Sequence, residues 1–426
     1  MAPKVLIATT TWWPFPARLS LALGKLGCEI AVICPSGSPA RRVRVVHRSF
    51  PYGPIAPLAS LQEAIGAFRP DLVIPCDDRV VAHLHDLYAR AVTQGDAGAS
   101  LRFLIERSLG APESYPVALS RARLLDIAAA HGIRVPPTRA ITKPADLESE
   151  ASRPFPWVVK VDGSWGGSGV SIVRTMAEAR KAVQRMARPI STLKMLVQLL
   201  VRCDPYPLRS WLLRTRHQVT IQDFVQGRPA NTMITCWQGE LLAATTVEVL
   251  STQHRLGASA VVRLIENAEI TAAARRLARE LRLSGFYGLD FMLEDITGAA
   301  YLIEMNPRPT QLGHLRLSAG RDLVGALYGC LAGLPPPSAP PVTTHDTIIL
   351  FPQAWHCDRQ SPFLETGFLD VPWQEPELMV ELLRKPRPTR GLLARLHAWY
   401  IRRDPALATM SATATSRGKA ALPFPG

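Results

Sequence analysis

The sequence predicts a parallel α/β unit followed by a larger α+β unit, on three observations. Short apolar strands alternate with helical patterns over residues 1–114, hairpin signals recur over residues 115–333, and prolines cluster at residues 334–341. Strands separated by helices are typical of a parallel sheet, whereas hairpins are typical of antiparallel pairs. A chain of 426 residues is long enough for two or three domains with cores of their own.

In the first unit, strands and helices alternate in order along the chain. We expect strands at residues 4–10, 28–34 and 71–75, and helices at residues 17–27, 60–68 and 79–91. The loop after the first strand contains Trp12, Trp13 and two prolines in place of GxGxxG, so the layout is Rossmann-like without a dinucleotide fingerprint. The two tryptophans either pack against a neighbouring domain or face a substrate.

The second unit combines hairpins with helices. A helix over residues 120–131 should end at Gly132, and a second helix is predicted over residues 269–282. Hairpins are predicted at 236–245 and 291–305. We expect two lobes, 115–190 and 191–333, and then a proline-rich connector, a C-terminal extension and a disordered basic tail over 334–426.

The charge of the chain indicates an anionic partner without choosing among several. The 49 basic and 35 acidic residues give a net charge of +14, and residues 384–426 alone contribute +8. Nucleic acid, an anionic membrane and a phosphorylated small molecule all fit this balance. The N-terminus lacks a secretory signal pattern, and the seven cysteines show no CxxC spacing. We therefore expect reduced thiols in a cytoplasmic protein.

The first stretch whose residues indicate a binding function is PWVVKVDGSWGGSGVSIV. A strand delivers Lys160, and a small-residue loop follows, made of Gly166, Gly167, Ser168 and Gly169. Glycine backbone N–H groups can surround an anion without obstruction by a Cβ atom, and the lysine adds a compact positive charge. The spacing is not that of a P-loop. A plain glycine hairpin is the alternative interpretation.

The second stretch is GLDFMLEDITGAAYLIEMNPR, which predicts two strands joined at Thr297-Gly298. Alternation puts Glu304 and Asn306 on one face of the second strand, and Asp290 lies on the first strand. Two carboxylates and an amide oxygen form the kind of donor set that Mg²⁺ prefers. Arg308 would face the same centre and could hold a developing negative charge. The alternative is a polar strand face without a ligand.

Together these two motifs resemble the ATP-grasp family, most closely the ATP-binding units of carbamoyl-phosphate synthase large subunits. The resemblance covers residues 115–333, and residues 1–114 resemble the pre-ATP-grasp domain that precedes such a fold. It implies that ATP binds between two α+β lobes with Mg²⁺, for which Mn²⁺ is an acceptable substitute.

The resemblance also implies roles for individual residues. Those that would bind ATP are Arg123, Lys160, Gly166, Gly167, Ser168, Gly169, Gln222, Asp223, Phe224 and Val225, the last four as an adenine-binding hinge. Asp290, Glu304 and Asn306 would bind the metal, and Arg263 and Arg308 would hold the transferring phosphate or a substrate carboxylate.

This chain departs from the family pattern at several positions. The hinge of the family usually carries Glu where this chain has Gln222 or Asp223. The family's ribose-binding acidic residue is replaced near Pro229, and Gln311 stands where the synthases have a basic residue. Carbamoyl phosphate is therefore not the expected product, and the altered hinge leaves the nucleotide preference open.

The activity implied by the resemblance is an ATP-dependent carboxylate–amine or carboxylate–thiol ligase. It would form an acyl-phosphate and release ADP and phosphate, with small-molecule carboxylate and amine substrates. An ATP-binding regulator or a kinase-like protein is the alternative, and a homodimer fits either. Asp77 and Asp78 follow a predicted strand, where they either contact the substrate or cap the next helix. His254 is either a general base or a structural residue.

The residues themselves bear on two further classes of partner. Nucleic acid is not expected, because residues 115–333 lack a basic stripe with interleaved aromatic side chains. Peripheral membrane contact through residues 384–403 is the other interpretation, because a cationic segment there has apolar residues at helical spacing. Docking of this segment on the protein's own core is its alternative. The apolar residues are Leu392, Leu393, Leu396, Trp399 and Tyr400.

Overall fold

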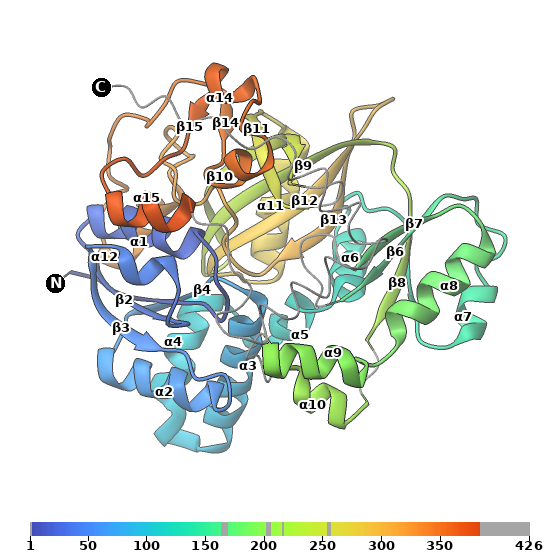
Figure 1. The fold of residues 1–426 in the computed structure, drawn as a ribbon, viewed down its shortest axis with the longest axis horizontal. Helices are drawn as coiled ribbons and strands as arrows, with labels where there is room; N and C mark the ends of the chain where they lie inside the picture. Colours follow the sequence, from blue (N-terminus) through green and yellow to red (C-terminus); the bar gives the residue numbers. More distant parts are fainter. Residues whose placement is uncertain (1, 163–168, 202–205, 215–216, 254–256, 384–426) are drawn as a thin grey trace.

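A computed structural model describes residues 2–162, 169–201, 206–214, 217–253 and 257–383, which form three β-sheets with flanking helices (Figure 1). The N-terminal sheet, a small sheet and a seven-stranded sheet follow one another along the chain. Within these residues no helix is both long enough and apolar enough to cross a membrane.

The N-terminal sheet is parallel, as the alternation of strands and helices predicts. Its order is β3-β2-β1-β4, formed by Val46–Pro51, Glu29–Cys34, Lys4–Ala8 and Leu72–Pro75. One face packs on α1, and the other on α2, α3 and α4. The sequence analysis missed β3, because this edge strand carries a polar, largely exposed sequence (VHRSFP). The helices are α1 (Phe15–Lys25), α2 (Pro57–Phe68), α3 (Asp78–Thr93) and α4 (Ala99–Leu109).

The small sheet is antiparallel and forms the first lobe of the second unit. Its order is β5-β8-β6-β7, with α7 (Pro144–Glu148) and α8 (Met176–Ala187) beside it. The fully buried Trp157 pairs with Asp223, so this lobe extends beyond the boundary predicted at residue 190. Between β7 and β8 lie α9 (Thr192–Leu196), a π-helical turn (Val197–Val201) and α10 (Pro207–Leu212). The strands are β5 (Thr138–Ile141), β6 (Trp157–Val161), β7 (Val170–Val173) and β8 (Val219–Asp223).

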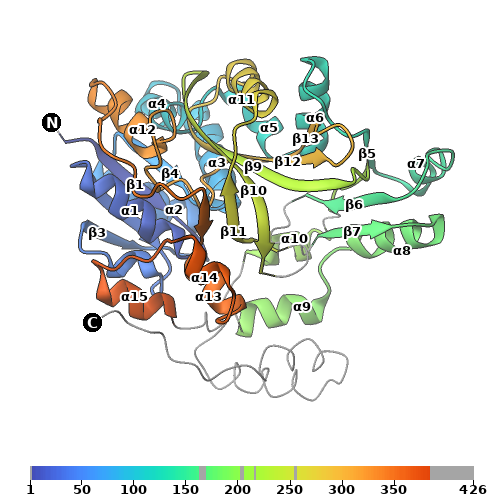
Figure 2. The ribbon, with the colours of Figure 1, turned by 90° about the horizontal axis from the view of Figure 1, so that it is seen from above.

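The seven-stranded sheet forms the second lobe, in the order β13-β12-β9-β10-β11-β14-β15. Its two predicted hairpins are confirmed: Gln238 and Gly239 take positive φ at one turn, as does Gly298 at the other. Figure 2 shows α6 (Arg121–Ala130) and α11 (Ala268–Glu280) along one face. The consecutive strands are β9 (Gly227–Trp237), β10 (Glu240–Thr252), β11 (Ser259–Leu264), β12 (Gly285–Glu294) and β13 (Ala300–Asn306).

The described part of the predicted C-terminal extension belongs to the main fold. Strands β14 (Thr347–Ile349) and β15 (Phe368–Leu369) continue the seven-stranded sheet beyond β11. Helix α15 (Pro376–Leu383) buries Leu378 and Leu382 in the core that contains α1. Sequence periodicity could not show this, because two- and three-residue strands carry no measurable alternation. The basic tail, residues 384–426, lies outside the described residues.

The N-terminal unit and the second lobe meet by close approach of two backbones. Gly110 follows α4 with φ of 91° and forms an isolated bridge with Leu283. A Cβ atom on Gly110 would lie 2.2 Å from the carbonyl oxygen of Arg282. Only glycine accommodates both the left-handed conformation and this distance.

Gly110→Ala should therefore lower the free energy of unfolding by about 2–4 kcal/mol, since strained φ and overpacking each cost about 1–3 kcal/mol. Urea denaturation measures the change. Gly37→Ala is the matched control, because its Cβ would meet no atom within 4 Å and its φ is not positive. Equal stability of the two variants would contradict the close approach.

Candidate functional site

The segment predicted as a hinge joins the two lobes. Strand β8 of the small sheet ends at Asp223, and β9 of the large sheet begins at Gly227. The Phe224 N–H donates to the carbonyl oxygen of Pro156 at 3.3 Å, and the Asp223 carboxylate forms an ion pair with Arg153. Residues 222–225 therefore connect the small sheet to the seven-stranded sheet.

Gln222 positions the lysine that the sequence analysis singled out. Its side chain is buried, and its Nε2 donates to Thr138 Oγ1 at 3.0 Å. Its Oε1 accepts a hydrogen bond from Lys160 Nζ at 2.7 Å. Gln222 thus supports Lys160 within the small sheet. A Glu in place of Gln222 would add a negative charge beside this ammonium.

Lys160 is a buried cation with a lowered pKa. It is 5% exposed, and its pKa falls to about 8 because burial disfavours the charged form and Arg121 repels it. The carboxylates of Glu304 and Asp290 oppose this shift. A compact charge that lacks solvation favours an additional anionic neighbour, such as a phosphate.

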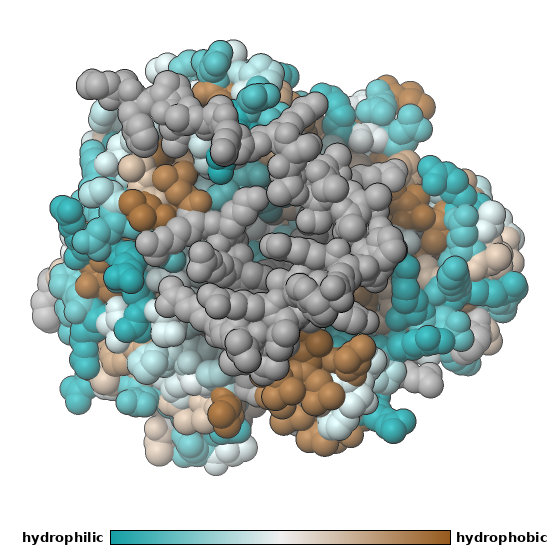
Figure 3. Space-filling view, in the orientation of Figure 1, coloured by the Kyte–Doolittle hydropathy of each residue, from teal (hydrophilic) through white to brown (hydrophobic). Residues whose placement is uncertain are grey.

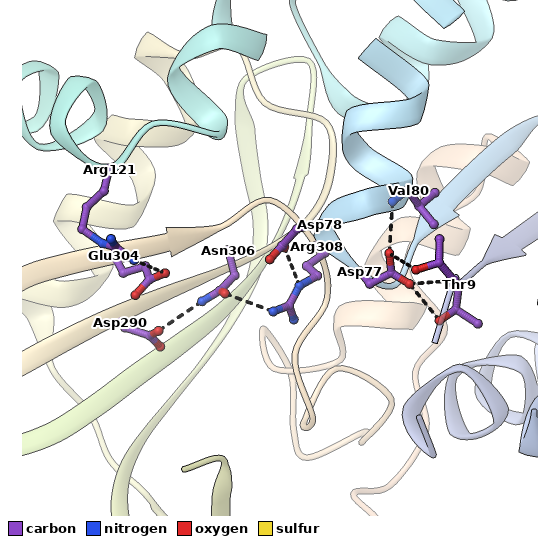
Figure 4. Close-up of polar contacts among 10 residues, drawn as sticks. Thr9, Asp77, Asp78, Val80, Arg121, Asp290, Glu304, Asn306 and Arg308 are labelled. Atoms are coloured by element: carbon purple, nitrogen blue, oxygen red, sulfur yellow. Dashed lines mark hydrogen bonds and ion pairs between the residues drawn. The ribbon is translucent and has the colours of Figure 1, made fainter. Parts of the chain in front are cut away.

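Asp290 and Glu304 lie on adjacent strands, as predicted, and the register makes them direct partners on β12 and β13 (Figure 4). A bulge between the pairs Asp290–Glu304 and Phe291–Leu302 turns Glu304 and Asn306 toward one face, while Met305 packs in the core beneath α6 and α11. Asn306 Nδ2 donates to Asp290 Oδ2 at 3.1 Å. The pKa of Asp290 rises to about 6, because the group is buried and Glu304 adds a like charge.

Arg121 is the site residue that sequence reasoning missed. It is 7% exposed, and its guanidinium contacts Glu304 Oε1 and Asp162 Oδ1, both at 2.9 Å. Arg123, which the resemblance placed over the nucleotide, is exposed on α6 and does not join the cluster. Helical spacing was the available signal, because Arg121 precedes the buried Leu124 and Leu125 by three and four positions and so shares their face.

Arg308 links the cluster to the N-terminal unit. Its Nε donates to Asp78 Oδ1 at 2.7 Å, and its Nη2 donates to Asn306 Oδ1 at 3.3 Å (Figure 4). The guanidinium lies 5.8 Å from the ring centre of Trp13. The loop after β1 and the start of α3 therefore border the predicted metal-binding face.

Asp77 is a helix cap. It accepts hydrogen bonds from the Val80 N–H at 3.0 Å and the Thr9 hydroxyl at 3.0 Å. Thr10 also donates to both of its oxygens. Because both carboxylate oxygens are occupied within the N-terminal unit, Asp77 fixes the start of α3, and Asp78 alone reaches the site.

Several predicted residues are not brought to this cluster. Arg263 is exposed on β11, and the registers of β9, β10 and β11 put it with Glu248 on the face opposite Asp290. Gly169 directly precedes β7, and its carbonyl accepts from the Val161 N–H at 3.0 Å. The remaining loop residues, Gly166, Gly167 and Ser168, lie outside the described residues, as does His254.

The donor set of the cluster suits a hard divalent cation. Asp290 and Glu304 offer carboxylate oxygens and Asn306 an amide oxygen. A cation would also compensate the like charges that raise the pKa of Asp290. In the described residues no group of three or more His, Cys, Asp and Glu side chains could hold a metal ion. Further ligands would come from a bound substrate, from water or from residues outside the described ranges.

Two sheet lobes joined by a hinge, with a buried lysine on one and paired carboxylates on the other, define an ATP-grasp architecture. Residues 123–311 match the family model of the ATP-grasp domain, so this part of the chain is an ATP-grasp domain. The fold predicted from the lysine, glycine and IEMNPR motifs is thereby confirmed. The stated closeness to carbamoyl-phosphate synthase units stays a prediction.

Solved structures share this fold over most of the chain. The N5-carboxyaminoimidazole ribonucleotide synthetase from Thermus thermophilus has a TM-score of 0.55 at 18% identity, covering 79% of this chain and 80% of that one. Biotin carboxylase from Campylobacter jejuni has a TM-score of 0.58 at 13% identity, with coverages of 79% and 72%. An L-amino acid ligase from Bacillus licheniformis has a TM-score of 0.53 at 14% identity, with coverages of 77% and 74%. No curated protein matches by sequence.

Replacing Glu304 with Gln should lower the pKa of Asp290 from about 6, because it removes the neighbouring like charge. The pKa should remain above the ordinary value of 3.8, since burial is the larger cause and persists. Carboxyl carbon-13 NMR titration measures the shift. Glu240→Gln, an exposed position on β10, should leave it unchanged. An unaltered Asp290 pKa in Glu304→Gln would show that the two carboxylates do not interact.

Proposed function

We propose that the protein is an ATP- and Mg²⁺-dependent ligase that joins a carboxylate to an amine or thiol and releases ADP and phosphate. The observation that carries this proposal is two series of polar contacts that come together where Asp290 and Glu304 pair. One runs from Asp162 through Arg121 to Glu304, and the other from Asp290 through Asn306 and Arg308 to Asp78. These contacts collect cations and carboxylates where the two sheets and the N-terminal unit meet.

The nucleotide would lie between the lobes against residues 222–225. Lys160 and Arg121 are the buried cations that would face its phosphates. Solved structures of similar fold include an N5-carboxyaminoimidazole ribonucleotide synthetase in complex with ADP and a biotin carboxylase domain with MgADP and bicarbonate, which supports this placement. Phosphate oxygens would take over part of the charge balance that Glu304 and Asp162 now provide for Arg121.

Asp290, Glu304 and Asn306 would hold the metal. Bound there, Mg²⁺ would neutralise charge on the β- and γ-phosphates and align the transferring group. The carboxyl group of Asp290 must be ionised to act as a ligand, and its pKa of about 6 leaves it ionised at neutral pH.

Arg308 would stabilise the charge that develops during transfer. A carboxylate oxygen of the substrate attacks the γ-phosphorus, the bond to ADP breaks, and an acyl-phosphate forms. The acceptor nitrogen or sulfur then attacks the acyl carbon, phosphate leaves, and the acceptor's proton passes to solvent. Arg308 is held by Asp78 and Asn306 before substrate arrives, so little reorganisation is required.

The substrate would bind where the N-terminal unit borders the ATP-grasp domain, beside Trp13 and Asp78. We infer that residues 1–114 act as the substrate-side unit of the enzyme. The buried thiols of Cys28, Cys34, Cys76 and Cys236 are free, which fits a reducing compartment such as the cytoplasm.

A screen of amino acids and small carboxylates, paired with amines or thiols, should find a pair that stimulates ADP release. Glu304→Ala should then lower that rate roughly 100–1000-fold, the usual cost of losing one preorganised electrostatic group. Arg263→Ala, on the opposite face of the sheet, should retain the wild-type rate. Full ADP release by Glu304→Ala would refute the metal site. Nucleotide binding without any stimulating pair would favour the ATP-binding regulator or kinase alternative.

Nucleotide affinity should depend on pH through Lys160. Phosphate favours the ammonium form, and the pKa of the free protein's Lys160 is about 8. Affinity for a non-hydrolysable ATP analogue should change little between pH 7 and pH 8, and above pH 8 it should fall by up to about tenfold per pH unit. Isothermal titration calorimetry across this range measures it. Lys160→Met should bind more weakly without this step, and the exposed Lys143→Met should keep it. The same step in Lys160→Met would assign it to another group.

A further inference from the structure

An exposed leucine surface lies on the α9–α10 segment of the first lobe. Figure 3 shows an apolar patch at the lower edge of the molecule, where Figure 1 places α9 and α10. The leucines are 40–74% exposed, and three of them follow one another at helical spacing along α9 and the π-helical turn. The leucine surface comprises Leu193, Leu196, Leu200, Leu212 and Leu213.

This surface is carried by an anchored element. The buried Met195 fixes α9, and Trp211 Nε1 donates to Thr192 Oγ1 at 3.4 Å, which ties α10 to α9. The ring of Tyr206, just before α10, lies 4.3 Å from the guanidinium of Arg79 and 5.9 Å from the ring of His83. Both partners belong to α3, so the segment spans from the small sheet to the N-terminal unit with its leucines still exposed.

The net charge of the protein comes from two segments, and the leucine surface lies in one of them. Residues 185–216 contain seven basic residues and one acidic residue, and residues 384–426 contain nine and one. These net charges, +6 and +8, account for the whole +14, because the rest of the chain has 33 basic and 33 acidic residues. Arg185, Arg188, Lys194 and Arg214 are exposed, and none forms an ion pair with another described residue.

The positive charge around the leucine surface distinguishes among the partners that could cover it. A second copy of the chain would bring the same cationic face against itself, and the protein's own tail at +8 would also be repelled. Nucleic acid would leave the leucines against water and phosphate, since such sites use aromatic stacking. An anionic bilayer meets both requirements, because leucines enter the acyl boundary while lysine and arginine meet the headgroups.

We propose that the leucine surface docks the protein on an anionic lipid bilayer, with the exposed cations beside it, such as Lys194 and Arg214, meeting the headgroups. The proposal is independent of the nucleotide chemistry, because none of its residues belongs to the candidate site.

Co-sedimentation of the full-length chain tests it, using vesicles of phosphatidylcholine with or without phosphatidylserine. Binding should require phosphatidylserine. The double variant Leu193→Ser/Leu213→Ser should bind these vesicles at least about tenfold more weakly, because it removes apolar area that would enter the bilayer. Lys194→Gln should weaken binding roughly fivefold, the usual contribution of one basic residue near such a surface. Ile55→Ser/Ile296→Ser and Arg44→Gln are matched controls, because these side chains are also exposed but lie elsewhere. Thermal unfolding should be unchanged in all variants.

The outcomes separate the other occupants. If a full-length Leu393→Ser/Trp399→Ser variant abolishes vesicle binding while Leu193→Ser/Leu213→Ser does not weaken it, the tail alone binds lipid and the proposal fails. It also fails if the leucine variant changes only the molar mass in solution, which would identify a dimer interface. Binding to nucleic acid in place of vesicles, lost in Lys194→Gln, would overturn it as well.

Discussion

The rest of this structure depends on two like charges that are held at paired positions of adjacent strands. Asp290 and Glu304 face each other across β12 and β13, and Asp290 is buried deeply enough that its pKa rises to about 6. Such a pair is tolerable only beside cations, since an uncompensated buried charge costs several kcal/mol. Arg121 comes from α6, Lys160 from the small sheet, and Arg308 from the loop after β13.

These cations can surround the carboxylates only if the N-terminal unit and the two lobes meet at one place. Arg308 is held by Asp78 at the start of α3, and α3 is in turn fixed by the cap of Asp77 to the loop after β1. Lys160 is supported by Gln222, where the chain passes from one lobe to the other. The charge balance of the site consequently depends on the arrangement of the N-terminal unit and the two lobes.

A second buried ion cluster attaches the C-terminal segment of the described chain to the N-terminal unit. Arg18 of α1 forms an ion pair with Asp370, and His314 Nε2 lies 2.8 Å from Asp370 Oδ2. Burial alone would raise the pKa of Asp370, yet His314 and Arg18 hold it at about 2. Because these residues belong to α1, the loop after β13 and the segment after β15, the cluster ties the N-terminal unit to the C-terminal segment. This explains why residues 334–383 are part of the fold.

The sequence by itself determined the fold class, the principal helices and hairpins, and the placement of Asp290 and Glu304 on adjacent strands, because each follows from local periodicity, turn residues or a short motif. Alternation also showed that Glu304 and Asn306 share one face opposite Met305, whereas the bulge before Glu304 decided which face that is. Only the tertiary structure decided that Arg121 and not Arg123 faces the carboxylates, that Arg263 points from the opposite face, and that Asp77 caps a helix while Asp78 holds Arg308. It also placed β14 and β15 at the edge of the large sheet. These outcomes depend on contacts between residues up to 230 positions apart in the chain, which no local pattern encodes.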